Sequence, residues 1–157
     1  MKEIERKFLV KRLQKDCRKK PLGLFIQGYI AISDDGSEVR IRKEDSKVYL
    51  TVKSSGELVR EEKEVKMTKK QFEILWPLTA GRRIEKIRYK IKLDNKIAYL
   101  DIYKGKLKGL KIVEVEFKSI KEAKNFIPPD WFSREVTYDK RYKNKNLAID
   151  GLPPNNL

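Results

Sequence analysis

Charged and apolar residues alternate at period two along most of this chain, which restricts it to strand-rich folds. The segment KEIERKFLV at residues 2–10 is typical of the pattern. Successive side chains of a strand point to opposite faces, so the pattern predicts strands with one charged and one apolar face. Eight segments are predicted to be strands: residues 2–10, 24–32, 37–43, 47–53, 58–67, 83–93, 97–103 and 110–118.

Helix signals are confined to short segments between and after these strands. Thr68 and Ser119 each stand where an N-cap is expected, and Pro77 ends the first helix. The last segment is basic and precedes a polar tail. The predicted helices are residues 69–75, 120–126 and 139–148.

The sequence shows no internal repeat and no linker, so it predicts one domain over residues 1–157 with a tail frayed from about residue 151. Eight strands and two or three short helices place the chain in the α+β class with an antiparallel sheet. An open sheet with one face in water would explain the alternation equally well.

The charged faces, however, carry like charges at positions i and i+2. Two like charges side by side on a strand repel each other unless an opposite charge lies between them. Their recurrence on five strands favours a closed barrel that points the charges inward and leaves the apolar faces outside, under helices. The pairs are Glu3/Glu5, Arg40/Arg42, Glu62/Glu64, Lys86/Arg88 and Glu114/Glu116.

Composition narrows the chemistry. The net charge of +15 indicates attraction to anions, such as nucleic acid, acidic lipids or phosphorylated small molecules. Without histidine, Ser-His-Asp and Cys-His catalysis and His-ligated zinc are excluded, and no P-loop is present. The single cysteine, Cys17, excludes an intrachain disulfide and fits a reducing compartment. The sequence has neither a signal peptide nor an apolar run long enough for a membrane span. We therefore expect a cytoplasmic protein without a membrane partner.

The predicted barrel interior is nearly neutral, with six basic against seven acidic side chains. Two divalent cations would bring this sum to about +3, facing roughly −4 to −5 on a triphosphate. A carboxylate-only site suits Mg²⁺ or Mn²⁺, and Arg and Lys suit phosphate oxygens. Glu38, Lys66, Lys90 and Lys118 share the parity but are expected at strand ends. The basic set is Lys7, Arg40, Arg42, Lys53, Lys86 and Arg88; the acidic set is Glu3, Glu5, Glu62, Glu64, Asp101, Glu114 and Glu116.

The opening Glu3-Ile4-Glu5-Arg6-Lys7 resembles the ExExK signature of the CYTH superfamily, the triphosphate tunnel metalloenzymes. Phe72-Glu73-Ile74-Leu75-Trp76-Pro77 and Gly81-Arg82-Arg83 resemble the compact bacterial branch, whose members are inorganic triphosphatases. Further segments follow the family's order across nearly the whole chain: Arg40-Ile41-Arg42, Leu50-Thr51-Val52-Lys53, Glu62/Glu64, Glu85-Lys86-Ile87-Arg88, Glu114-Val115-Glu116 and Asp139-Lys140-Arg141-Tyr142-Lys143-Asn144.

The resemblance implies an eight-stranded antiparallel barrel that forms a tunnel, with a C-terminal helix around Tyr142 closing one end. It implies a pair between Lys86 and Tyr29, which with Glu5 are the catalytic candidates. Phosphate-binding candidates are Lys7, Arg40, Arg42, Lys53, Lys86, Arg88, Arg141 and Lys143. Metal-binding candidates are Glu3, Glu5, Glu114 and Glu116, assisted by Glu64 or Asp101, with Glu62 the weakest.

The resulting hypothesis is hydrolysis of inorganic triphosphate to phosphate and diphosphate with two Mg²⁺ or Mn²⁺ ions. Hydrolysis of thiamine or nucleoside triphosphates and adenylate cyclisation are alternatives on the same scaffold. By resemblance, cyclase-type members carry residues ahead of ExExK, whereas Glu3 stands near the start here. A non-catalytic module that binds polyphosphate or RNA is a further alternative, although no RNA-binding signature is present. The partner is expected to be a small triphosphate, with no specific nucleic acid, and a homodimer is compatible with the sequence.

Overall fold

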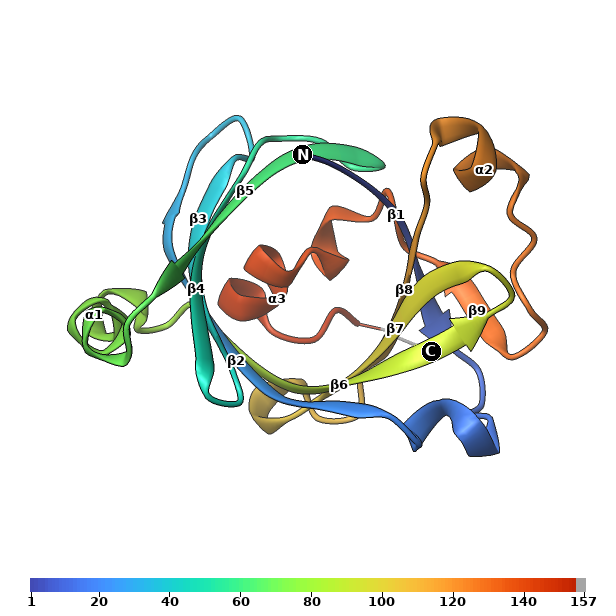
Figure 1. The fold of residues 1–157 in the computed structure, drawn as a ribbon, viewed down its shortest axis with the longest axis horizontal. Coiled ribbons are helices and arrows are strands. Elements are labelled where there is room, and N and C mark those ends of the chain that lie inside the picture. Colours follow the sequence, from blue (N-terminus) through green and yellow to red (C-terminus); the bar gives the residue numbers. More distant parts are fainter. Residues whose placement is uncertain (155–157) are drawn as a thin grey trace.

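The computed structural model describes residues 1–154, whose strands close into an antiparallel barrel with short helices, as predicted (Figure 1). The strand order is β5-β4-β3-β2-β6-β7-β8-β1, and a further β1–β5 pairing closes the ring. The barrel strands are β1 Lys2–Val10, β2 Pro21–Ile32, β3 Glu38–Glu44, β4 Lys47–Lys53, β5 Val59–Met67, β6 Arg83–Leu93, β7 Lys96–Tyr103 and β8 Lys111–Glu116.

Strand β1 closes the barrel through two different partners. Its first residues pair with β5, from Lys2 opposite Glu61 to Ile4 opposite Val59. Its next five residues pair along the other edge with residues 112–116 of β8. Beyond the β5 contact, the end of β1 pairs with β9 (Phe132–Glu135), a short strand outside the barrel that the sequence analysis did not predict.

The helices lie near their predicted positions, with one difference. Helix α1 (Lys69–Leu75) begins with a capping box between Thr68 and Gln71, and α2 (Ile120–Asn125) is capped by Ser119. The predicted third helix is instead split at Lys143, whose extended backbone separates the 3₁₀ turn η4 (Lys140–Tyr142) from α3 (Asn144–Asp150). Three other 3₁₀ turns are η1 (Lys15–Arg18), η2 (Trp76–Thr79) and η3 (Gly105–Leu107).

Two apolar clusters cover the outside of the barrel. One packs α1 on β3 and β4 through Phe72, Ile41 and Val48. The other packs α2 and β9 on β1, β7 and β8 around Phe8 and Phe132. In Figure 1, α1 and α2 lie outside the ring of strands, on opposite sides of it. This arrangement agrees with the predicted outward direction of the apolar faces.

A third apolar cluster fills one end of the interior, which the parity argument had assigned to charge alone. Leu9 continues the inward face of Glu3, Glu5 and Lys7, and it packs with Leu147 of α3. Figure 1 shows α3 inside the ring of strands, as the resemblance implied. The barrel is therefore polar toward one end and plugged by apolar packing at the other.

The end of the chain is described only in part. The expected frayed tail includes residues 155–157, which lie outside the described residues, whereas Pro153 is buried. Within residues 1–154, no helix is both long and apolar enough to span a bilayer.

Candidate functional site

A polar cavity of about 200 Å³ lies inside the barrel, beside the apolar layer under α3. Eight basic and seven acidic side chains line it, so the lining carries one net positive charge. The basic residues are Lys7, Arg40, Arg42, Lys53, Arg60, Lys86, Arg88 and Lys143, and the acidic residues are Glu3, Glu5, Glu38, Glu44, Glu62, Glu114 and Glu116.

Most of the residues predicted for the site line this cavity, but three do not. Arg141 is exposed and pairs with Asp139, whereas Lys143, two residues later, lines the cavity. Glu64 lies outside the lining and accepts a hydrogen bond from Thr51 Oγ1 at 2.9 Å. Asp101 is fully buried behind the cavity wall. Conversely, Glu62, the weakest acid of the predicted set, does line the cavity.

Five polar lining residues were not among the predicted site residues: Glu38, Glu44, Arg60, Tyr99 and Asn144. Glu38 shares the parity of Arg40 and was set aside as a strand end, yet it is 5% exposed and lies 3.0 Å from Arg60 Nη2. Arg60 has the parity of Glu62, so the same rule could have found it. Glu44 ends β3 at the rim, and Asn144 comes from α3, whose inward direction no strand pattern predicts.

A buried carboxylate fixes two of the basic side chains. Asp101 accepts two hydrogen bonds from Arg88, from Nε and Nη2, and one from Lys86 Nζ, all at 2.7 Å. Arg88 Nη2 also donates to Glu114 Oε2 at 2.8 Å. Asp101 therefore orients two cations from behind the wall, and we propose this positioning role for it in place of the predicted role as a metal ligand.

Lys86 and Tyr29 do not form the expected pair in this structure. Lys86 Nζ donates to Asp101, and the Tyr29 hydroxyl accepts from Gln27 Nε2 at 2.9 Å. Burial raises the pKa of Tyr29 to about 12. Burial and the Arg88 charge lower the pKa of Lys86 to about 7, although Asp101 opposes this shift. Both side chains line the cavity, and Lys86 has the pKa of a group that can exchange a proton near neutrality.

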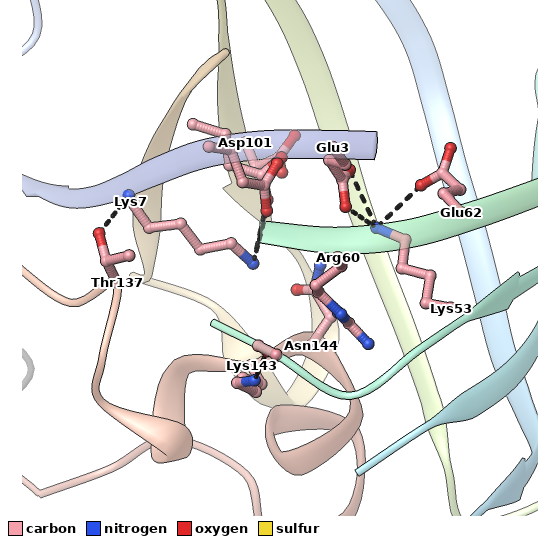
Figure 2. A network of polar contacts seen from close by, with 12 residues as sticks. Glu3, Lys7, Lys53, Arg60, Glu62, Asp101, Thr137, Lys143 and Asn144 are labelled. Carbon is pink, nitrogen blue, oxygen red and sulfur yellow. Dashed lines mark hydrogen bonds and ion pairs between the residues drawn. The ribbon is translucent and has the colours of Figure 1, made fainter. Parts of the chain in front are cut away.

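Two lysines hold carboxylates on the β1 side of the cavity. Lys53 Nζ lies 3.0 Å from Glu3 Oε2 and 3.1 Å from Glu62 Oε2, and Figure 2 shows it reaching between these two acids. Lys7 Nζ lies 3.6 Å from Glu5 Oε1 and 3.5 Å from Glu114 Oε1. On this side two lysines are set against four carboxylates, so the network keeps an excess of negative charge.

The opposite side, on β3, carries two arginines whose hydrogen-bond donors are not all used. Arg40 Nε and Arg42 Nε are buried and have no hydrogen-bond partner within residues 1–154. Burial, with the charges of Arg40 and Arg88, lowers the pKa of Arg42 to about 10. Buried donors without acceptors are costly, so this side of the cavity is suited to an anion with several oxygens.

The carboxylates on β1 and β8 are suited to a cation. Glu5 lies directly opposite Glu116 in the strand register, and like charges in that relation repel. Burial, with Glu114 and Glu3, raises the pKa of Glu5 to about 7, and the same influences raise the pKa of Glu116. A cation between these strands would relieve the repulsion.

The donor chemistry fits a hard divalent ion that arrives with its anion. Across residues 1–154, no three acidic side chains already converge as a closed metal cage. Mg²⁺ commonly uses one or two carboxylates and completes its shell with water and substrate phosphates.

The plugged end of the cavity has a basic floor. Figure 2 places Lys143 and Asn144 below the strand that carries Lys7, near Arg60. Lys143 Nζ donates to the Gly56 carbonyl, and Tyr103 donates to Asn144 Oδ1 at 2.6 Å. Burial, Arg60 and Lys145 lower the pKa of Lys143 to about 8. Lys143 therefore adds positive charge at the plugged end of the cavity.

A closed barrel whose interior holds arginine Nε donors without acceptors on one side and carboxylates that repel each other on the other is suited to binding a polyanion together with cations. The chain belongs to the CYTH domain family, whose sequence profile matches residues 1–142. It is 48% identical over 151 residues to the inorganic triphosphatase of Nitrosomonas europaea, covering 95% of this chain and 98% of that protein.

Two further comparisons agree. The chain is 40% identical over 154 residues to the inorganic triphosphatase of Acetivibrio thermocellus, covering 94% of this chain and 93% of that protein. The crystal structure of the inorganic triphosphatase NE1496 superposes with a TM-score of 0.70 at 45% identity, covering 94% of each chain.

Proposed function

We propose that this protein hydrolyses inorganic triphosphate to phosphate and diphosphate with the help of two divalent ions, Mg²⁺ or Mn²⁺. The observation that carries the proposal is the division of the cavity, with arginine donors lacking acceptors on β3 and mutually repelling carboxylates on β1 and β8. A triphosphate with bound cations supplies both missing partners at once.

The side chains of the proposal have separable roles. Arg40 and Arg42 bind phosphate oxygens through their free donors, and Arg88 is held toward the cavity by Asp101. Glu3, Glu5, Glu114 and Glu116 hold the divalent ions, which supply charge neutralisation at the phosphate oxygens.

Proton handling falls to two buried groups in the proposal. Lys86, with a pKa of about 7, can donate a proton to the departing phosphate oxygen near neutral pH. Glu5 carries a raised pKa and can orient or deprotonate a water. Tyr29 lies farther along the same wall and hydrogen-bonds Gln27 rather than Lys86, so we propose that it shapes the cavity there.

A phosphate-release panel tests this proposal. Inorganic triphosphate, diphosphate, ATP and thiamine triphosphate are each incubated with Mg²⁺, Mn²⁺ or a chelator. We expect release from inorganic triphosphate with metal and none with chelator. Faster turnover of ATP or thiamine triphosphate would favour an organic substrate, and turnover in chelator would contradict the metal requirement.

Polyanion binding on the outer surface is a second candidate because of the charge distribution. The cavity lining accounts for one positive charge of the chain's +15, so the excess lies elsewhere on the protein. Titration of single-stranded RNA against increasing salt tests it: steep weakening without sequence preference is expected for electrostatic binding. No binding at low salt would remove this candidate.

A further inference from the structure

Strand β2 lies between β3, which carries Arg40 and Arg42, and β6, which carries Lys86 and Arg88, and it presents uncharged side chains to the cavity. In the register, Gln27 of β2 lies opposite Arg42 of β3, and Phe25 lies opposite Lys86 of β6. Phe25 and Tyr29 both line the cavity. The arginines of β3 and the cations of β6 are therefore kept one strand apart.

Phe25 lies between guanidinium groups from both sides. Its ring centroid is 5.1 Å from Arg42 Cζ and 5.5 Å from Arg88 Cζ, and the residue is only 3% exposed. The face of an aromatic ring carries negative electrostatic potential and attracts a cation within about 6 Å. One ring thus interacts favourably with two cations that repel each other.

The two arginines depend on this ring to different degrees. Arg88 also donates hydrogen bonds to Asp101 and Glu114, and the ring centroid of Tyr99 lies 4.9 Å from Arg88 Cζ. Arg42 contacts acids at the rim: it forms an ion pair with Glu44, and its Nη2 lies 4.0 Å from Glu64 Oε2. Removing the attraction of Phe25 would leave these rim acids free to draw Arg42 outward.

We propose that Phe25 is a positioning residue that keeps the Arg42 guanidinium directed into the cavity, where it binds the phosphate chain. The inference rests on the proposed function for the identity of the ligand. Phe25 itself has no polar group and touches no reacting atom in this scheme. It acts through Arg42, so its loss should weaken substrate binding more than the chemical step.

Progressive fluorination of the Phe25 ring tests this inference, because fluorine weakens the ring's attraction for cations with little change in shape. Phenylalanine 25 is replaced by its mono-, di- and trifluoro analogues in the full chain. The same analogues at Phe72, which packs on Trp76 outside the barrel, serve as the matched control. The measurements are kcat and KM for inorganic triphosphate, and calorimetric binding of triphosphate in chelator.

We expect KM to rise with each added fluorine, to about tenfold for the trifluoro ring, while kcat and the thermal midpoint change little. A tenfold change corresponds to about 1.4 kcal/mol, which lies within the range of a buried cation–π contact. The Phe72 series should not change KM. A flat Phe25 series, or one that changes kcat alone, would overturn the inference.

The readouts separate this inference from the proposed function. If the wild-type chain binds triphosphate without hydrolysing it, and binding weakens with fluorination, the function is wrong and the role of Phe25 stands. If the wild-type chain hydrolyses triphosphate but the series is flat, only the role of Phe25 is wrong. A wild-type chain that neither binds nor hydrolyses triphosphate overturns both.

Discussion

Replacing Asp101 with asparagine distinguishes a structural carboxylate from a metal ligand. Asp101 is fully buried and accepts hydrogen bonds from Arg88 and Lys86. Asparagine keeps its shape but removes the negative charge, so both cations lose their main partner. Breaking one side of a buried ion pair costs about 3–5 kcal/mol because a charge is left uncompensated.

Two features place the expected loss at the lower end of that range. Lys86 can release its proton, because its pKa is already lowered to about 7. Arg88 keeps its hydrogen bond to Glu114 Oε2 at 2.8 Å. We therefore expect the free energy of unfolding of Asp101→Asn to fall by about 3 kcal/mol, and its Tm to fall by roughly 6–12 °C for a chain of this length.

The loss should grow as pH falls. The folded-state pKa of Lys86 is lowered from 10.5 to about 7, so the unfolded chain binds this proton first and stability falls as pH falls from about 10.5 to about 7. Without Asp101 this loss of stability increases, and the difference between variant and wild type should be larger at a pH of about 6 than at about 9.

The assay is urea and thermal unfolding of the metal-free proteins. Metal binding is titrated separately, at temperatures at which both proteins are folded. Asp139→Asn is the matched control, because it weakens an exposed pair with Arg141 while asparagine can still cap η4. Its midpoint should change little. Wild-type stability of Asp101→Asn combined with lost metal binding would refute this reasoning and restore Asp101 as a ligand.

Three further predictions follow from the cavity and its floor. The folded-state pKa of Glu5 is raised to about 7, so the stability contributed by its proton is lost as pH rises toward that value. In urea unfolding of the metal-free proteins, the free energy of unfolding of Glu5→Gln should therefore be about 3 kcal/mol larger than that of the wild type at a pH of about 8, with no difference near pH 4. The same variant should lack metal-dependent turnover. In steady-state kinetics, Arg42→Ala should raise KM for triphosphate at least tenfold, roughly the loss of a charge-assisted hydrogen bond, whereas Arg141→Ala should leave kcat and KM unchanged. Leu147→Ala, in the fully buried plug, should lower the free energy of unfolding by about 2–5 kcal/mol in the same urea assay, and an unchanged value would mean that α3 does not pack as described.

The period-two pattern predicted the fold because it records which face of each strand is buried. In a closed barrel every strand has one face toward the interior, so the inward direction of Glu5, Arg40 and Lys86 could be predicted from the alternation alone. The pattern could not predict β9, because four residues are too few to establish a period.

The alternation of side chains along a strand does not predict how far along the barrel axis an inward-facing residue lies. Asp101 and Glu114 both face inward, yet only Glu114 lines the cavity, because Arg88 and Lys86 enclose Asp101. The alternation also cannot predict site residues that come from outside the strands. Lys143 enters the cavity through a break in a predicted helix, and only the extended backbone at that residue reveals its direction.

The pairing of β1 has a consequence for how the chain folds as it is synthesised. The main partner of β1 is residues 112–116, so this strand must wait until most of the chain has left the ribosome before it can pair. An apolar strand left unpaired for that time would invite aggregation, but β1 carries glutamate and lysine at alternate positions. The residues proposed to hold metal and phosphate in the finished barrel thus also keep the nascent strand soluble, and replacing several of them with apolar residues should reduce the yield of folded protein before it affects any measured rate.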